Sequence, residues 1–212
     1  MDTHNWYVNI EDKGRTVLNL VRVGADVFGR ARLIQEFSEF SLACSLANSG
    51  KDEEYKARLL PFLDEYLIDS IRVCIFFENY MKAALIERRY IAHRIGEGLP
   101  DLRKEQKRRP ISFNELTAVE PFTDVGGMNV IHNGLEQFAI GAETLFGKQA
   151  YREAVDVPPH FFPHLRSLTK DRNRLHFMNY REMGHSEKFV EVLGEMMSFV
   201  DLAIRRVRVT YG

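Results

Sequence analysis

The sequence predicts an all-α protein, an up-and-down helical bundle with a helical extension at its N-terminus. Two observations support this fold class. Apolar residues recur at steps of three and four along most of the chain, which is the period of an amphipathic helix. No segment of useful length alternates apolar and polar residues as a half-buried strand would. We expect residues 1–60 to form the extension and residues 61–212 to form the bundle.

The first two helical segments precede a long apolar one. Residues 16–48 carry a helical pattern, which ends near Gly50 because glycine accepts left-handed backbone. A short helix is expected after Asp52, and Pro61 should interrupt it because proline cannot donate a helical hydrogen bond. Between Ile71 and Ile86, twelve of sixteen residues are apolar or aromatic. Residues 62–95 are therefore predicted to form the central helix of the bundle.

The second half of the chain predicts a connector and three further helices. Glycine and proline punctuate residues 96–110, which are expected to form the connector, and residues 111–126 look irregular. Further helices are predicted over residues 128–146, 163–179 and 187–209. The last has a regular apolar seam, typical of a core-facing helix, at Phe189, Leu193, Met196, Val200, Ala203 and Val207.

Composition excludes several classes of protein. The chain has 212 residues, 45% hydrophobic and 28% charged, which is ordinary for a globular domain and not for a disordered one. The net charge of −1 gives no overall attraction to nucleic acid, so no DNA partner is expected. We expect no signal peptide and no membrane span. Cys44 and Cys74 lie in apolar surroundings, which predicts buried thiols in a reducing, cytoplasmic compartment.

Two groups of polar residues interrupt the apolar helices. In the central helix Glu78 and Lys82 are four residues apart, an arrangement that favours an ion pair. In the fourth helix Arg172 and His176 are also four apart, with Asn173 between them. Arginine suits a phosphate diester, and histidine exchanges a proton near neutral pH. These residues fit RNA cleavage without a metal, or simply a helix end decorated with cations.

A cluster of basic residues in the connector is a second candidate nucleic-acid contact. Its members are Arg103, Lys104, Lys107, Arg108 and Arg109. One interpretation is a solvated loop or helix end, and the other is a basic surface that holds a phosphate backbone. His160 and His164 have a spacing that suits zinc but lack a third ligand nearby, so no metal site and no cofactor are expected. His93 looks isolated.

The two polar groups together resemble the HEPN superfamily (higher-eukaryote and prokaryote nucleotide-binding domains). The stretch "ENYMKAAL" at residues 78–85 is similar to the family pattern E-x-x-x-K-A-x-L. Arg172 and Asn173, followed by His176 and Tyr180, resemble its Arg–His motif. The similarity covers residues 65–210, but only these two motifs are specific. Three residues separate Arg172 from His176, whereas family members usually have about four to six.

The resemblance implies a homodimer with the Arg–His helices of two subunits facing each other. It implies a metal-independent endoribonuclease of a toxin–antitoxin or phage-defence system, with RNA as substrate and an antitoxin protein as partner. Arg172 would hold phosphate, His176 would act as acid and base, and Asn173 would orient one of them. Glu78 would anchor an arginine of the motif, with Lys82 and Tyr180 as supporting residues. Arg174 is expected to contact RNA together with the basic residues of the connector.

The same residues are also compatible with functions other than RNA cleavage. The short spacing is compatible with a non-catalytic member, and a helical interaction or scaffold protein of unknown function is the main alternative. An enzyme acting on a small nucleotide is a third hypothesis, which needs a closed pocket in place of an open groove.

Overall fold

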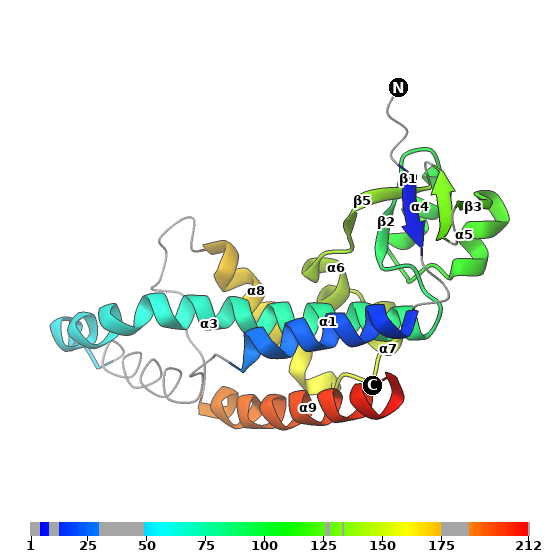
Figure 1. Cartoon of the computed structure of the whole chain (residues 1–212). Helices are drawn as coiled ribbons and strands as arrows, with labels where there is room; N and C mark the ends of the chain where they lie inside the picture. Colours follow the sequence, from blue (N-terminus) through cyan, green and yellow to red (C-terminus); the bar gives the residue numbers. More distant parts are fainter. Residues whose placement is uncertain are drawn as a thin grey trace. The chain divides into compact units, whose positions relative to one another are not determined.

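The computed structural model describes residues 5–8, 13–29, 49–125, 128–132, 134–174 and 187–211 (Figure 1). The chain is predominantly helical, and the predicted all-α class is confirmed. The helices are α1 (Lys13–Phe28), α3 (Asp52–Glu87), α4 (Pro100–Gln106), α5 (Phe113–Val119), α6 (Ala142–Gly147), α7 (Gln149–Glu153), α8 (Phe162–Arg174) and α9 (Glu187–Tyr211), with a 3-10 turn at Pro159–Phe161. The described residues also include the short strands β1 (Asn5–Val8), β2 (His93–Ile95), β3 (Phe122–Val125), β4 (Met128–His132) and β5 (Leu135–Ala139).

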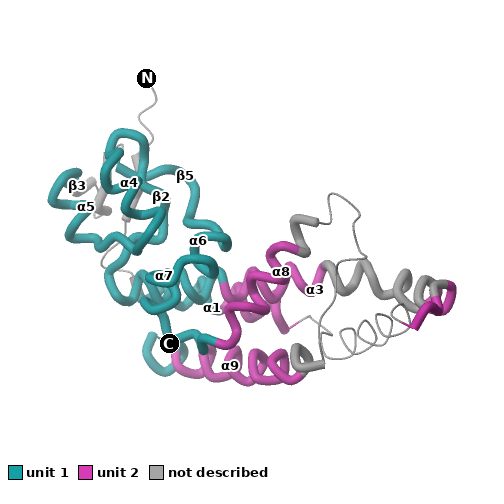
Figure 2. The backbone as a smooth tube through the Cα atoms, turned by 180° about the vertical axis from the view of Figure 1, so that it is seen from behind, with its two compact units in different colours: residues 1–21, 78–159, 207–212 teal, residues 22–77, 160–206 magenta. Residues whose placement is uncertain are grey.

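The chain forms two compact units, each assembled from separate segments (Figure 2). The first unit consists of residues 1–21, 78–159 and 207–212, and the second of residues 22–77 and 160–206. The predicted boundary between residues 60 and 61 stays a prediction.

Helix α3 differs from its prediction at both ends. It runs without a break for 36 residues, so the expectation that Pro61 interrupts it was wrong. It also ends at Glu87 and not near residue 95. Arg89 has a φ of 61°, and the amides of Arg89 and Tyr90 donate to the carbonyls of Ile86 and Leu85 at 3.0 and 2.8 Å. These two bonds on a left-handed residue form a Schellman cap, which stops the helix.

The core of the second unit is aromatic. Phe76 and Phe77 of α3 are fully buried. The Phe77 ring lies 5.8 Å from the rings of both Phe161 and Phe199, and the Phe76 ring lies 5.6 Å from that of Phe28. Aromatic pairs at such distances add stability beyond their buried area. Cys74 is buried in the same core, as predicted, whereas Cys44 lies outside the described residues.

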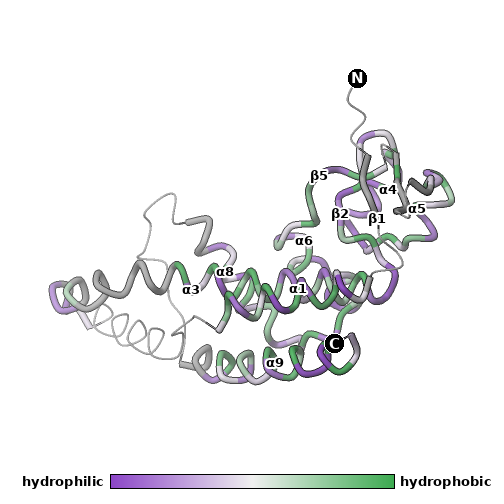
Figure 3. Tube along the Cα trace, viewed as in Figure 1, coloured by the Kyte–Doolittle hydropathy of each residue, from purple (hydrophilic) through white to green (hydrophobic). Residues whose placement is uncertain are grey.

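Helix α9 follows the predicted seam. Its hydrophobic and hydrophilic residues alternate along the tube in Figure 3. The buried positions are Leu193, Met196, Val200, Ala203 and Val207, with exposed fractions of 4% or less. Phe189, the remaining seam residue, has a side chain outside the described part. The steps of four and three confirm that one face of this helix is buried.

The first unit contains two small antiparallel sheets. In one sheet β4 lies between β1 and β3, and in the other β2 pairs with β5. The predicted helix over residues 128–146 was wrong, because Met128–His132 forms β4 and Leu135–Ala139 forms β5, and the helix α6 begins only at Ala142. The inward-facing apolar side chains form one core cluster, Ile91, Ile95, Ile111, Leu116, Ile131 and Leu135.

The predicted connector at residues 96–110 contains a short helix. Helix α4 begins with Pro100, a residue suited to the first helical turn because its missing N–H is not needed there. Helix α5 follows after Ser112, whose hydroxyl accepts the amide of Glu115 while the Glu115 carboxylate accepts the amide of Ser112. This capping box fixes the start of α5. Helix α4 packs against the strand β2, which carries His93 and Arg94.

Candidate functional site

The predicted Arg–His motif begins in the last described turn of α8. Arg172, Asn173 and Arg174 lie in the last turn of the helix as described, and their side chains are outside the described part. His176 and Tyr180 also lie outside the described residues. The proximity of a guanidinium and an imidazole at this place therefore stays a prediction.

Glu78 and Lys82 form the ion pair that their spacing predicted. The Lys82 Nζ donates to Glu78 Oε1 at 2.6 Å, and the two side chains are only 13% and 20% exposed. Their neighbours along α3 include the buried residues Phe77 and Met81. Because a half-buried charge is costly without a partner, each of the two charges stabilises the other. The pair therefore holds one carboxylate and one ammonium group in place on α3.

His93 on β2 adds a third titratable group to this part of the first unit. Burial lowers the pKa of His93, and the positive charge of Lys82 lowers this pKa further. Both effects favour the neutral form of the imidazole. In the sequence, His93 looks isolated. No pattern joined it to Lys82, because the turn after α3 brings the two together.

The predicted basic surface is largely neutralised. Arg103 bonds Glu97 and Glu136 at 2.9 and 3.0 Å. Arg109 bonds Glu115 at 2.7 Å, and both Arg109 and Arg108 lie within 3.7 Å of Glu105. The Arg109 hydrogen bond and the Ser112 amide lower the pKa of Glu115 to about 2. These acids are absent from a simple count of basic residues, so the count overstates the positive charge.

Lys104 and Lys107 differ from the arginines of the same segment. Both ammonium groups are exposed, and no ion pair joins either of them to the residues that the structure describes. They are therefore the cations of the predicted basic surface that are free to meet an anionic ligand.

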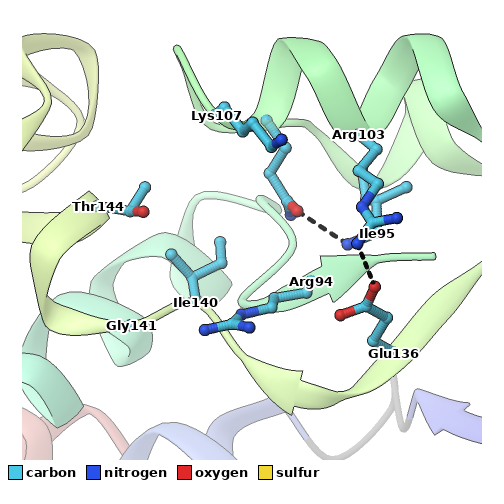
Figure 4. A pocket seen from close by; sticks show the side chains of 9 residues that line it. Arg94, Ile95, Arg103, Lys107, Glu136, Ile140, Gly141 and Thr144 are labelled. Atoms are coloured by element: carbon cyan, nitrogen blue, oxygen red, sulfur yellow. Dashed lines mark hydrogen bonds and ion pairs between the residues drawn. The ribbon is translucent and has the colours of Figure 1, made fainter. Parts of the chain in front are cut away.

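A pocket of about 200 Å³ lies beside α4 (Figure 4). Arg94 from β2, Lys107 from the turn after α4, and Thr144 from α6 line it with polar groups. Arg103 and Glu136 form an ion pair on its wall. The buried side chains of Ile95 and Ile140 complete the lining. No sequence pattern pointed to Arg94, Glu136, Gly141 and Thr144, because only the folded chain brings them to α4.

Gln106 holds the pocket together. Its side chain is buried, with its Oε1 accepting the amide of Ile95 at 2.8 Å and its Nε2 donating to the carbonyl of His93 at 2.7 Å. The backbone carbonyl of Gln106 accepts a hydrogen bond from the Tyr151 hydroxyl at 2.7 Å. One glutamine therefore ties α4 to β2 and α7. Because the oxygen and the nitrogen of its side-chain amide are both hydrogen-bonded, Gln106 supports the pocket and has little freedom to bind a ligand.

The described residues show neither a metal site nor a membrane segment. No group of three or more histidine, cysteine, aspartate or glutamate side chains among them is arranged to hold a metal ion. Within the same residues, every helix is too short or too polar to cross a bilayer. No protein-family model, curated protein or solved structure matches the chain.

Proposed function

We propose that the chain is a HEPN-like protein that binds RNA and cleaves it without a metal, using Arg172 and His176. The observation that carries the proposal is the ion pair of Glu78 and Lys82 on α3. These two residues belong to the first of the two motifs on which the resemblance rests. Their half-buried charges support a polar centre inside the helical protein, where simple packing favours apolar residues.

The proposed reaction needs one base, one acid and a stabiliser of negative charge. The His176 imidazole takes the proton from a ribose 2′-hydroxyl, whose oxygen attacks the adjacent phosphorus. The bond from phosphorus to the 5′-oxygen breaks, and this oxygen takes up a proton. The products are a 2′,3′-cyclic phosphate and a 5′-hydroxyl. Arg172 stabilises the charge that builds on the phosphate oxygens, as a planar guanidinium is suited to do, while Asn173 orients one of these groups.

The proposal extends to partners and setting. Two copies would form a homodimer with their α8 helices facing each other, which would double the number of motif residues at the cleft. Arg174 and the free ammonium groups of Lys104 and Lys107 would contact the RNA backbone. A toxin–antitoxin or phage-defence role in the cytoplasm, with an antitoxin protein that blocks the site, is the corresponding biological setting.

A non-catalytic interaction or scaffold protein is the second candidate function. The observation in its favour is the pairing of Arg103, Arg108 and Arg109 with nearby carboxylates, which leaves fewer cations for RNA. The short spacing between Arg172 and His176 points the same way.

Cleavage of RNA by the purified protein in EDTA tests the two candidates. We expect the wild-type protein to produce fragments with 2′,3′-cyclic phosphate ends, and His176→Ala and Arg172→Ala to produce none. His160→Ala is the matched control, because the His160 ring is exposed and lies outside the Arg–His motif: its Nε2 bonds the surface carboxylate of Glu195 at 2.7 Å, and its edge packs against Phe161. Cleavage that persists in His176→Ala, or that is absent from the wild-type protein, favours the scaffold.

A further inference from the structure

The pocket beside α4 is lined by two cationic side chains, Arg94 and Lys107, that are not paired with the other described residues. Arg94 is exposed, and neither it nor Lys107 forms an ion pair or side-chain hydrogen bond with a described residue. A terminal nitrogen of Arg94 lies 3.8 Å from the place where a Cβ on Gly141 would be. In Figure 4 Arg94 runs along Ile140 and Gly141, and Lys107 lies on the other side of the hollow.

The third cation of the pocket is already committed. Arg103 is hydrogen-bonded to Glu97 and paired with Glu136, so it forms a wall and offers little net charge. The hydroxyl of Thr144 adds a donor on the side of α6. A guanidinium fork, an ammonium and a hydroxyl around one hollow are the groups that bind phosphate oxygens.

We propose that this pocket binds a phosphomonoester group, either the phosphate of a free mononucleotide or the phosphorylated end of an RNA strand. This goes beyond the proposed cleavage site, because none of the pocket residues belongs to the Arg–His motif. It stands whether or not the chain cleaves RNA.

The size of the pocket selects a terminal phosphate group. At about 200 Å³, it is smaller than the ~300–1,000 Å³ of pockets that enclose drug-sized ligands. A phosphate with part of its sugar fits, whereas a whole nucleotide does not. The base of a mononucleotide, or the rest of an RNA strand, would therefore lie outside the pocket.

The charge of the pocket also favours a monoester over a diester. A phosphomonoester carries about −1.5 to −2 charges at pH 7, because its second pKa is about 6, whereas a backbone diester carries one. Arg94 and Lys107 match the dianion. The affinity should therefore rise as the pH increases from 5 to 7.5, when the second proton of the phosphate leaves.

Binding of short oligonucleotides to the full chain tests the proposal. The probes are 2′-O-methyl trinucleotides with a 5′-phosphate or a 5′-hydroxyl, which lack the 2′-hydroxyl that cleavage requires. We expect the phosphorylated probe to bind at least about tenfold more tightly, as expected for two charge-assisted contacts. Arg94→Gln with Lys107→Gln should remove this preference. The control with matched charge loss, Arg166→Gln with Lys148→Gln, should retain it, because both residues are exposed and neither lines the pocket.

Two further probes identify which phosphate compound the pocket binds, and the outcomes that would overturn the proposal follow. Adenosine monophosphate that competes as well as the phosphorylated trinucleotide indicates a mononucleotide ligand, and weaker competition indicates an RNA end. Inorganic phosphate should displace either probe at an ionic strength where chloride does not. Equal affinity for the two trinucleotides, or equal losses in the pocket and control variants with circular dichroism unchanged, would overturn the proposal. RNA cleavage plays no part in these readouts, so failure of the proposed nuclease is detected separately.

Discussion

Gln106→Met offers a direct test of how the pocket is held together. Methionine has nearly the same shape as glutamine but lacks both amide groups. The change removes the side-chain amide that accepts from the amide of Ile95 and donates to the carbonyl of His93. Each buried group that loses its partner costs about 1–3 kcal/mol, so the two together should cost ~2–4 kcal/mol once some water reaches the pocket side. The substitution should weaken the first unit without removing a charge.

Urea unfolding followed by fluorescence measures this loss. Trp6 is the single tryptophan, and it pairs with Ile131 in the sheet of the first unit, so its emission reports on that unit. With a urea dependence of about 2 kcal/mol per molar, the midpoint should fall by ~1–2 M. Hydrogen exchange of the Ile95 amide should accelerate as well, because this amide donates to Gln106.

Gln149→Met is the matched control for this prediction. Gln149 is exposed, and its side chain bonds Glu153, four residues along α7, at 2.6 Å. The control should change the free energy of unfolding by less than ~0.5 kcal/mol. If Gln106→Met shifts the midpoint no more than Gln149→Met does, and Ile95 exchange is unchanged, the buried amide does not join α4 to β2 as the structure indicates.

Two further predictions concern carboxylates of the same unit. Glu78→Gln leaves the half-buried Lys82 ammonium unpaired and should lower the free energy of unfolding in urea by about 3 kcal/mol. Adding Lys82→Met should recover most of this loss. If the losses of the two single variants simply add in the double variant, the pairing is contradicted. The folded pKa of Glu115, about 2, lies below its ordinary value of 4.5, so its bonds to Arg109 and Ser112 stabilise the protein fully above pH 4.5 and are lost as the pH falls towards 2. The melting temperatures of wild type and Glu115→Gln should therefore converge between pH 5 and 2.5, and a constant difference would show that Glu115 does not titrate in this way.

Helix α9 was predictable because its pattern is local. The buried residues from Leu193 to Val207 recur at steps of three and four, as one helix face requires, and the buried Val192 lies beside them. The prediction of a helix over residues 128–139 was wrong because their pattern is ambiguous. Val130, Ile131 and Leu135 satisfy a helical step as well as a strand, and the strands β4 and β5 belong to different sheets. The Gly-Gly pair between Val125 and Met128, which are register partners, was the available hairpin signal.

The candidate site divides along the same line. Glu78 and Lys82 could be joined from the sequence because four residues separate neighbours on a helix face. Arg94 and Lys107 could not, because they meet only where β2 lies against α4. Likewise, Glu136 is too distant in sequence to be assigned to Arg103. Sequence patterns within one element are therefore informative here, whereas the charge balance of a surface depends on which elements the fold brings together.

This charge balance decides which part of the first unit attracts an anion. Arg103, Arg108 and Arg109 are each paired with a carboxylate at 3.7 Å or less, so their fields cancel within a short distance. Unpaired charges act over roughly 8 Å at physiological ionic strength. Among the basic residues of this segment and of β2, Lys104, Lys107 and Arg94 have no ion pair with a described residue, and two of these three line the pocket. A long RNA backbone would meet few free cations along the segment, whereas a single dianionic phosphate in the pocket would meet two at once, which is why an end or a small nucleotide is favoured over a continuous strand.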